Sequence, residues 1–370
     1  TKRTTKNKTH KKTIFIYIWR KNSMEKPIKI GVVGLGRIGM SVHLSCLRDR
    51  PDKFKVVAAC DLIPERCEKY AEVFGCRTYG RIEELIADPE VEVVDIATRS
   101  ADHYAHTKMA LLAGKSVLVE KPFCRTYAEA CELNRLGSQP SGPRVFVRHN
   151  RRFEEGFLKV NEIIDSGILG EVYEIKLTRN EYQRRNDWQT IKEFGGGQLL
   201  NWGPHIVDHS LRFCGGGYTA MHADIKRVAA VGDAEDHIKL VFKGVNNRIV
   251  DMEISGGAAV PTPEYILYGT RGGLVSEGNT LHLRYLDPSV PLADIQANPA
   301  TPDGATFGNN EVLTWKTEDI ELSGKDKTDV VWDYFYDAYR NHKPYPITPE
   351  QAAEVVRVLE NAKLGTEFAE

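Results

Sequence analysis

Between residues 28 and 148, short apolar runs alternate with segments of helical periodicity. The apolar runs are Ile28–Val33, Phe54–Cys60, Val93–Ala97, Ser116–Glu120 and Arg144–Arg148, and the helical segments include Glu65–Phe74, His103–Leu112 and Tyr127–Leu136. Strands that are apolar along their whole length are buried on both faces, and helices between them make parallel neighbours possible. The alternation therefore predicts an α/β domain over residues 24–148, with a doubly wound parallel sheet.

Beyond residue 148 the pattern changes. After a helix expected near Phe153–Ile164, apolar and polar residues alternate along Glu171–Arg179. Further strands are expected at His237–Lys243, Arg248–Ile254, Glu264–Gly269 and Leu281–Leu286, with turns rather than helices between them. Period-2 strands joined in this way predict a largely antiparallel sheet with one covered face. Residues 149–346 are therefore expected to form an α+β domain.

Residues 347–370 have the signals of a closing helix. Thr348 and Gln351 have the spacing of a capping box, and Pro349 occupies the first helical position. An apolar face follows, and Gly365 is expected to end the helix. We expect this helix to pack back on the body of the molecule.

Charge separates the first 23 residues from the rest of the chain. Residues 1–23 contain eight Lys or Arg and no Asp or Glu, whereas the remainder contains 42 basic and 51 acidic residues, a net charge of −9. The body therefore gives no electrostatic reason to expect nucleic acid. The apolar run at 13–19 is much shorter than the roughly 20 residues of a membrane span. We expect this basic leader to lie outside the fold, and we expect no membrane partner.

Two observations bear on compartment and metal binding. Seven cysteines are scattered through the chain without a CxxC pair or metal-type spacing, which favours reduced thiols in a cytoplasmic protein. His205, Asp208 and His209 share one helical face at positions i, i+3 and i+4, so a metal site there is conceivable. Their spacing matches no standard zinc signature, and we expect no metal.

The first strand leads into a glycine-rich turn, Gly31-Val-Val-Gly-Leu-Gly-Arg-Ile-Gly39. Gly34, Gly36 and Gly39 form GxGxxG at the point where a helix begins, the arrangement in which a Rossmann domain holds a dinucleotide pyrophosphate. Asp61 ends the second strand, where a carboxylate accepts hydrogen bonds from the ribose hydroxyls of NAD and repels a 2′-phosphate. Leu62 rather than an arginine follows it, so we expect NAD, with NADP less favoured.

Two basic residues are candidates for chemistry. Lys121 stands where the strand Ser116–Glu120 ends, just before Pro122, and can reach a ligand at the carboxyl edge of the sheet. Its cation would stabilise an alkoxide that develops during hydride transfer. Farther along, Gly203-Pro204 opens a helix that carries His205, a candidate acid-base residue. Asp208 on the same face could orient a neighbouring imidazole or contact substrate.

Taken together, these segments resemble the Gfo/Idh/MocA family of NAD(P)-dependent oxidoreductases. The matching segments are Ile30–Gly39, the Asp61 strand end, Ala97–His103, Ala113–Pro122, Gly195–His209 and the helix at Thr348–Gly365. The resemblance implies an N-terminal Rossmann domain and a second, α+β domain with a large, mostly antiparallel open sheet. It also implies a site between the two domains and roles for Lys121 and His205. It further implies contacts to the cofactor from Arg37, Ile38, Thr98, His103, Glu120 and Lys121, and a homodimer or homotetramer formed through the C-terminal sheet.

The chain departs from the family pattern at Asn201, four residues before His205, where many members have an aspartate. An amide can hold a substrate hydroxyl but cannot accept its proton, so His205 works alone or shares the proton with Lys121. Arg99-Ser100 also replaces the usual Pro-Asn after Thr98. Upstream, Tyr182, Arg185, Asp187 and Trp188 suit a polyhydroxylated ring or an ordinary surface loop. Arg151 and Arg152 suit an acidic sugar or simple ion pairs.

The leading hypothesis is an NAD-dependent dehydrogenase or reductase that acts on a secondary hydroxyl of a sugar, inositol or glycoside. Lys121 would stabilise the alkoxide, His205 would be the acid-base, and Asn201 would position the substrate. Asn201 keeps a second enzyme hypothesis open, a glycosidase that uses NAD for transient oxidation without net redox change. A third hypothesis is a regulatory protein that binds NAD and sugar without turnover.

Overall fold

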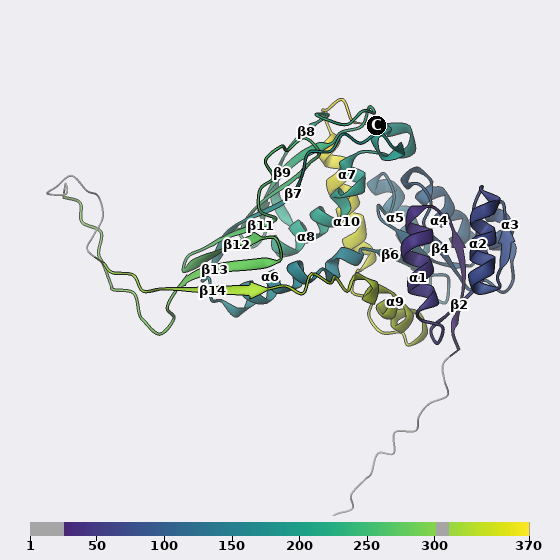
Figure 1. Cartoon of the computed structure of the whole chain (residues 1–370), viewed down its shortest axis with the longest axis horizontal. Coiled ribbons are helices and arrows are strands. Elements are labelled where there is room, and N and C mark those ends of the chain that lie inside the picture. The colour runs from purple at the N-terminus through teal and green to yellow at the C-terminus, as the bar shows by residue number, and fades with distance from the viewer. Residues whose placement is uncertain (1–25, 301–310, 370) are drawn as a thin grey trace, which may run out of the picture.

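The computed structural model describes residues 26–300 and 311–369. The basic leader at 1–23 lies outside the described residues. Two sheets organise the chain, and each lies in its own lobe, with helix α10 (Pro349–Lys363) running between the lobes (Figure 1). No helix within the described ranges is long and apolar enough to cross a bilayer.

The first lobe is the predicted doubly wound domain. Its six strands are β1 (Ile28–Val33), β2 (Phe54–Cys60), β3 (Arg77–Tyr79), β4 (Val93–Ile96), β5 (Ser116–Glu120) and β6 (Val145–Arg148). All pair in parallel in the order β3-β2-β1-β4-β5-β6. The helices are α1 (Leu44–Arg48), α2 (Pro64–Phe74), α3 (Ile82–Ala87), α4 (His103–Leu112) and α5 (Tyr127–Leu136). The Rossmann prediction is confirmed; β3 was missed because its three residues are polar or partly exposed.

The second lobe contains the predicted open sheet. Its eight strands run in the order β14-β13-β12-β11-β7-β10-β9-β8. Their bounds are β7 (Val172–Asn180), β8 (Tyr218–Lys226), β9 (His237–Gly244), β10 (Ile249–Ser255), β11 (Tyr265–Gly269), β12 (Gly272–Glu277), β13 (Thr280–Leu286) and β14 (Trp315–Glu321). Only the β7–β10 pair is parallel, which confirms a mostly antiparallel sheet. Sequence patterns missed β8, β12 and β14; six of the seven β14 residues are exposed, so it has no apolar alternation.

Helices α6 (Glu155–Ser166), α7 (Gln198–Asn201) and α8 (Gly203–Phe213) contribute to the core of the second lobe. Helix α10 begins with the expected capping box, in which the Thr348 hydroxyl accepts from the Gln351 N–H at 3.2 Å. Its buried side chains divide between the two cores: Ala352, Ala353 and Val356 join the first, whereas Val355, Val358, Leu359 and Ala362 join the second. This helix therefore joins the two lobes through apolar packing.

Helix α9 (Val331–Arg340) differs from the sequence-based division of the chain. The sequence pattern places it in the α+β domain at 149–346, but its apolar side chains lie in the core of the parallel sheet. Trp332 and Phe335 are fully buried there and pack against Phe54 of β2. The aromatic face of α9 thus belongs to the first lobe although it follows the second in sequence.

Candidate active site

The glycine turn after β1 leaves room for a nucleotide. Gly34 has φ +89°, and a Cβ there would lie 2.7 Å from the backbone of Ala97. A Cβ on Gly39 would meet the Gly34 carbonyl oxygen at 2.3 Å, so both positions require glycine for packing. At Gly36, by contrast, nothing lies within 4 Å of an added Cβ. The open space above Gly36 is what close approach of a pyrophosphate needs, so the turn fits a dinucleotide cofactor.

Asp61 faces the glycine turn from the end of β2. Its carboxylate accepts the Leu35 N–H at 2.7 Å and the Ile63 N–H at 2.9 Å, which fixes its orientation. Sequence reasoning missed Arg66, which lies in the first turns of α2. Its Nη1 atom is 3.5 Å from both oxygens of Asp61, and its side chain is 42% exposed. A cation therefore stands beside the carboxylate that was expected to select NAD.

Lys121 lies immediately beyond the end of β5, as its position in the sequence predicted. Its Nζ atom donates to the backbone carbonyl of Asn201 at 2.8 Å, so residues from the two lobes meet at this point. Burial lowers the pKa of Lys121 to about 8; Glu120 opposes this shift, whereas Arg151, Arg37 and Arg148 add to it. A substantial fraction of Lys121 is therefore unprotonated in mildly alkaline solution.

His205 projects from the first turn of α8 and is 5% exposed. Its Nδ1 atom has no hydrogen-bond partner in the described part of the chain. Burial holds the pKa of His205 well below 6.5, and the nearby charges of Lys121 and Arg151 lower it further. His205 is therefore a neutral imidazole at physiological pH. Lys121 and His205, which lie 84 positions apart in the sequence, are brought into one electrostatic environment.

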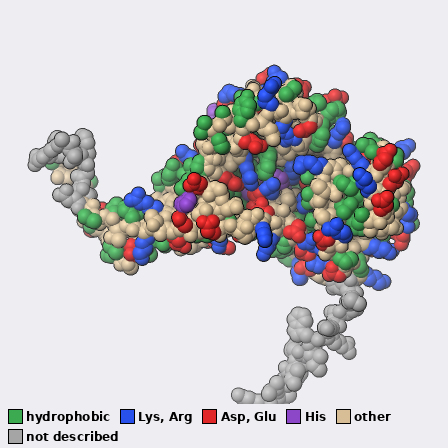
Figure 2. Space-filling model, in the orientation of Figure 1, with side chains coloured by type: hydrophobic (Ala, Val, Ile, Leu, Met, Phe, Trp, Pro, Cys, Tyr) green, Lys and Arg blue, Asp and Glu red, His purple; other side chains and the backbone are tan. Residues whose placement is uncertain are grey.

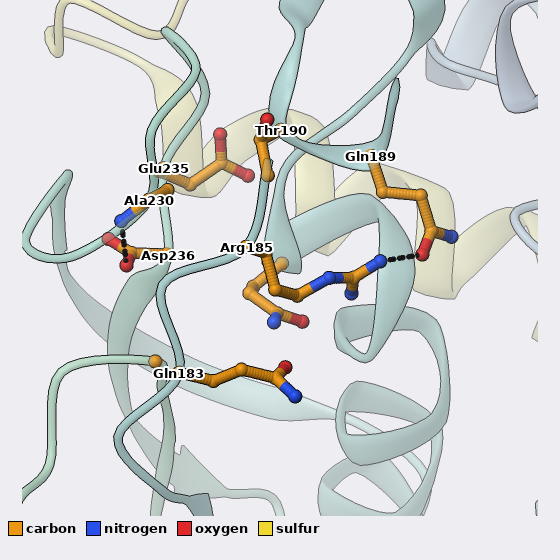
Figure 3. A pocket seen from close by; sticks show the side chains of 9 residues that line it. Gln183, Arg185, Gln189, Thr190, Ala230, Glu235 and Asp236 are labelled. Atoms are coloured by element: carbon orange, nitrogen blue, oxygen red, sulfur yellow. Dashed lines mark hydrogen bonds between the residues drawn. The ribbon is translucent and has the colours of Figure 1, made fainter. Parts of the chain in front are cut away.

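The side chain of Asn201 has protein partners. Its Oδ1 atom accepts from Gln189 Nε2 at 3.1 Å, and its Nδ2 atom donates to Gln198 Oε1 at 3.3 Å. Gln189 in turn accepts from Arg185, as Figure 3 shows. The predicted substrate loop is thus linked to Asn201 by a chain of hydrogen bonds.

Other members of that loop lie nearer the surface. Arg185 forms an ion pair with Asp187, in which Nη2 is 2.8 Å from Oδ2. Tyr182 is 60% exposed and forms an isolated antiparallel β-bridge with Gly257. Trp188 is half-buried at the start of a short 3₁₀ helix. Arg185 also lines a small pocket with Gln183, Gln189, Thr190, Gln198, Glu235 and Asp236 (Figure 3). The loop therefore borders a polar pocket beside Asn201.

Asp208 is engaged by an arginine rather than by an imidazole. Arg152 donates to its two carboxylate oxygens at 2.9 and 2.5 Å, and Asp208 is only 1% exposed. Arg152, which suited either an acidic sugar or an ion pair, therefore forms an ion pair within the protein. Arg151 pairs with Glu154 and stacks over Trp202, with its guanidinium carbon 4.3 Å from the ring centroid. His209 stacks on Phe157, with ring centroids 3.9 Å apart.

A buried charge network, which we call the His43 network, lies behind Lys121 and was missed by sequence reasoning. His43 places Nδ1 2.6 Å from Asp95 Oδ2 and Nε2 2.9 Å from Glu120 Oε1. Arg148 donates to the same Glu120 oxygen at 2.6 Å, and the Lys121 N–H lies 3.2 Å from the other. Glu120 anchors this network, and its expected contact with the cofactor stays a prediction. A π-helical turn at Gly39–His43 directs His43 inward.

Two further residues expected near the cofactor, His103 and Thr98, are linked to the segment that follows Lys121. The Nδ1 atom of His103 donates to the Pro122 carbonyl oxygen at 2.6 Å, and its Nε2 atom lies 3.2 Å from the carbonyl oxygen of Thr98. The Lys121–Pro122 peptide bond is cis. Arg37 and Ile38 lie in the glycine turn; Arg37 is exposed and close enough to lower the pKa of Lys121.

Basic side chains and histidine gather in the hollow between the lobes (Figure 2). Among the described residues, no group of three or more His, Cys, Asp or Glu side chains is arranged to hold a metal ion. The hollow therefore combines a dinucleotide turn with a lysine and a neutral histidine, the constituents of a nicotinamide-dependent oxidoreductase site.

Comparison with known proteins identifies the class further. The model of the oxidoreductase family with an NAD-binding Rossmann fold matches residues 28–149, and that of the GFO/IDH/MocA C-terminal domain matches residues 157–275. The chain therefore belongs to the GFO/IDH/MocA family of oxidoreductases.

Several relatives span most of the chain. An uncharacterized oxidoreductase of Schizosaccharomyces pombe is 31% identical over 78% of this chain and 79% of its own length. The scyllo-inositol 2-dehydrogenase (NADP(+)) of Bacillus subtilis is 26% identical over 90% of this chain and 92% of its own. An NAD-binding protein from Listeria innocua has the same fold, with a TM-score of 0.76 at 22% identity over 92% of this chain and 98% of its own.

Proposed function

We propose that this protein is a dehydrogenase or reductase that transfers a hydride between a nicotinamide cofactor and a secondary hydroxyl of a sugar, inositol or glycoside. The observation that carries the proposal is the contact between the two lobes at Lys121. The Nζ atom of Lys121 donates a hydrogen bond to the Asn201 carbonyl oxygen, and its charge acts on the buried His205. The B. subtilis relative named for scyllo-inositol supports a polyol as substrate.

When bound, the nicotinamide ring would accept the hydride from the carbon that bears the hydroxyl. The hydroxyl proton then needs a base, and two groups are near. A proton on His205 would stand beside Lys121 and Arg151, both of which disfavour the imidazolium. The amine of Lys121, once unprotonated, is the better acceptor, and the ammonium that forms then stabilises the oxygen. His205 holds the hydroxyl and shares in the proton transfer.

This assignment predicts that oxidation rates rise as the pH increases through about 8, because the active form of Lys121 is the unprotonated amine. Lys121→Met should lower kcat by about 10²- to 10⁴-fold while the cofactor still binds. Lys121→Arg is the matched variant, since a guanidinium keeps the charge but cannot lose its proton. Nicotinamide absorbance from pH 6 to 10 gives the profile. Full turnover by Lys121→Met would contradict the assignment.

For the cofactor, we propose NAD as the preferred form, with Arg66 giving residual use of NADP. Asp61 is fixed by two backbone N–H groups and would repel a 2′-phosphate, whereas the exposed Arg66 can turn toward one. Arg66→Ala should reduce kcat/KM for NADP about tenfold and leave that for NAD within about twofold. Steady-state rates with both cofactors test this, and an equal loss with both would contradict it.

A second candidate, redox-neutral cleavage of a glycosidic bond, is favoured by the neutral Asn201, whose amide is held by Gln189 and Gln198. The same assays distinguish the two. With aryl glycosides as substrates, release of the aglycone without accumulation of NADH indicates cleavage, whereas stoichiometric NADH indicates net oxidation.

A further inference from the structure

We infer that His149 is a third substrate-contacting residue of the proposed site, whose imidazole forms a hydrogen bond with a hydroxyl next to the one that reacts. The inference rests on the proposed function and extends it to a residue that neither the sequence motifs nor the comparisons single out. Three observations carry it: the position of His149, its unpartnered nitrogens, and the charges around it.

The sheet places His149 beside Lys121. Strands β5 and β6 pair in parallel, and the last pair in their register is Glu120 with Arg148. Lys121 and His149 are the next residues on the two strands, so both stand at the carboxyl edge of the sheet. This is the edge at which doubly wound sheets bind their ligands. Lys121 affects the charge state of His149, as expected of neighbours.

His149 is 2% exposed, and neither of its ring nitrogens has a hydrogen-bond partner in the described ranges. Buried polar groups in folded proteins are nearly always paired, so two such nitrogens on one ring need an occupant to satisfy them. Two other buried histidines of the same lobe differ: His43 has a carboxylate at each nitrogen, and His103 has a carbonyl oxygen at each. His149 is therefore the histidine at this edge with capacity to bind something else.

The charge state of the ring identifies what it can bind. Burial lowers the pKa of His149 to about 4, with Asp208 and Glu120 opposing the shift and Arg152 and Lys121 adding to it. The ring is therefore neutral, with one N–H donor and one acceptor nitrogen. A hydroxyl can bond either nitrogen because it both donates and accepts, whereas a carboxylate, which only accepts, can bond the N–H alone. With the reacting hydroxyl at Lys121 and His205, a hydroxyl on the adjacent carbon is the natural partner.

The test compares wild type with His149→Leu, which has similar volume and no nitrogen, and His149→Gln, which restores a donor and an acceptor. Substrates are scyllo-inositol, myo-inositol and D-glucose, each with its monodeoxy analogues, and NAD or NADP as cofactor. We expect His149→Leu to reduce kcat/KM about tenfold for a parent polyol and to leave it unchanged for the analogue that lacks the contacted hydroxyl. His149→Gln should recover part of the loss, and the dissociation constant for NADH should not change.

Two results would overturn the inference while the dehydrogenase assignment stands. An equal loss with the parent and every deoxy analogue would indicate a purely structural role, and no loss with the parent would indicate a resident water on the ring. If wild type oxidises none of the polyols, binding is measured by quenching of NADH fluorescence. Binding to wild type that weakens about tenfold in His149→Leu supports the inference although turnover has failed. Absence of binding overturns it.

Discussion

Two sets of buried histidines, His43 on one side and His149, His205 and His209 on the other, have pKa values shifted in opposite directions. In the His43 network, burial alone would lower the pKa of His43, but Asp95 and Glu120 more than compensate, and the pKa is raised above 6.5. In the hollow between the lobes, burial lowers the pKa of His149 and His209 to about 4, and that of His205 falls well below its ordinary value. Both sets of histidines are buried, so the neighbouring charged groups determine the direction in which each pKa is shifted.

The difference follows from how the carboxylates are distributed. In the network, acidic and basic side chains alternate as Asp95, His43, Glu120 and Arg148, so a carboxylate oxygen lies at each imidazole nitrogen of His43. In the hollow, Asp208 is the carboxylate that most opposes the fall in the pKa of His149 and His209, and Arg152 donates to both of its oxygens. The network therefore holds the backbone around Lys121 beside charged groups. In the hollow, His149 and His205 are neutral rings with nitrogens that have no partner among the described residues, whereas the Nε2 atom of His209 lies 2.9 Å from the Arg151 carbonyl oxygen.

The largest effect expected from this comparison is on stability. His43→Leu would remove the imidazole that lies between Asp95 and Glu120 in the core, and Asp95 would lose its His43 partner while Glu120 kept Arg148. Removing one partner of a buried ion pair costs about 3–5 kcal/mol, and we expect a loss of that size in the free energy of unfolding. Urea denaturation at pH 7 measures it.

His149→Leu is the matched control for that measurement. It makes the same substitution in a histidine of equal burial, but it breaks no hydrogen bond, so the free energy of unfolding should change by less than about 1 kcal/mol. Equal losses in the two variants would show that burial rather than pairing determines what these histidines contribute.

Sequence reasoning found the parts of the site that depend on local pattern. The glycine turn, Asp61 and Lys121 all lie at the ends of apolar strands, and parallel pairing brings strand ends to one edge. His205 followed from the Gly203-Pro204 helix start, although the local pattern could not give its distance from Lys121, because these residues come from different lobes.

The residues that were missed depend on contacts between distant elements. In the sequence, nothing distinguishes His43 from other polar residues of a first helix. In the structure, it lies in a π-helical turn and contacts Asp95, which is 52 positions farther along the chain. Arg66 lies five residues past Asp61, in the first turn of α2. His149 carried a usable signal, since it follows β6 just as Lys121 follows β5. The same rule, applied to every strand end, would have found it.

A smaller expected effect is the change in the free energy of unfolding as the pH falls, which differs between the two sets of histidines. A histidine whose folded pKa lies below 6.5 contributes stability that is complete above 6.5 and is lost as the pH falls toward the folded pKa. For a shift to about 4, the loss at pH 5 is about 2 kcal/mol for each ring, and His149 and His209 both have this shift. His43 has the opposite sign: its contribution is complete below 6.5 and is lost as the pH rises through its folded pKa.

Urea denaturation of wild type and His149→Leu at pH 8 and pH 5 measures this difference. Because the variant lacks one ring that must be protonated in the unfolded chain, it should lose about 2 kcal/mol less than wild type between the two pH values. His43→Leu should not share this protection, because the raised pKa of His43 makes its contribution to stability grow rather than fall as the pH decreases. If His149→Leu and wild type lose stability in parallel, His149 carries its proton in the folded protein, and the two sets of histidines are electrostatically alike.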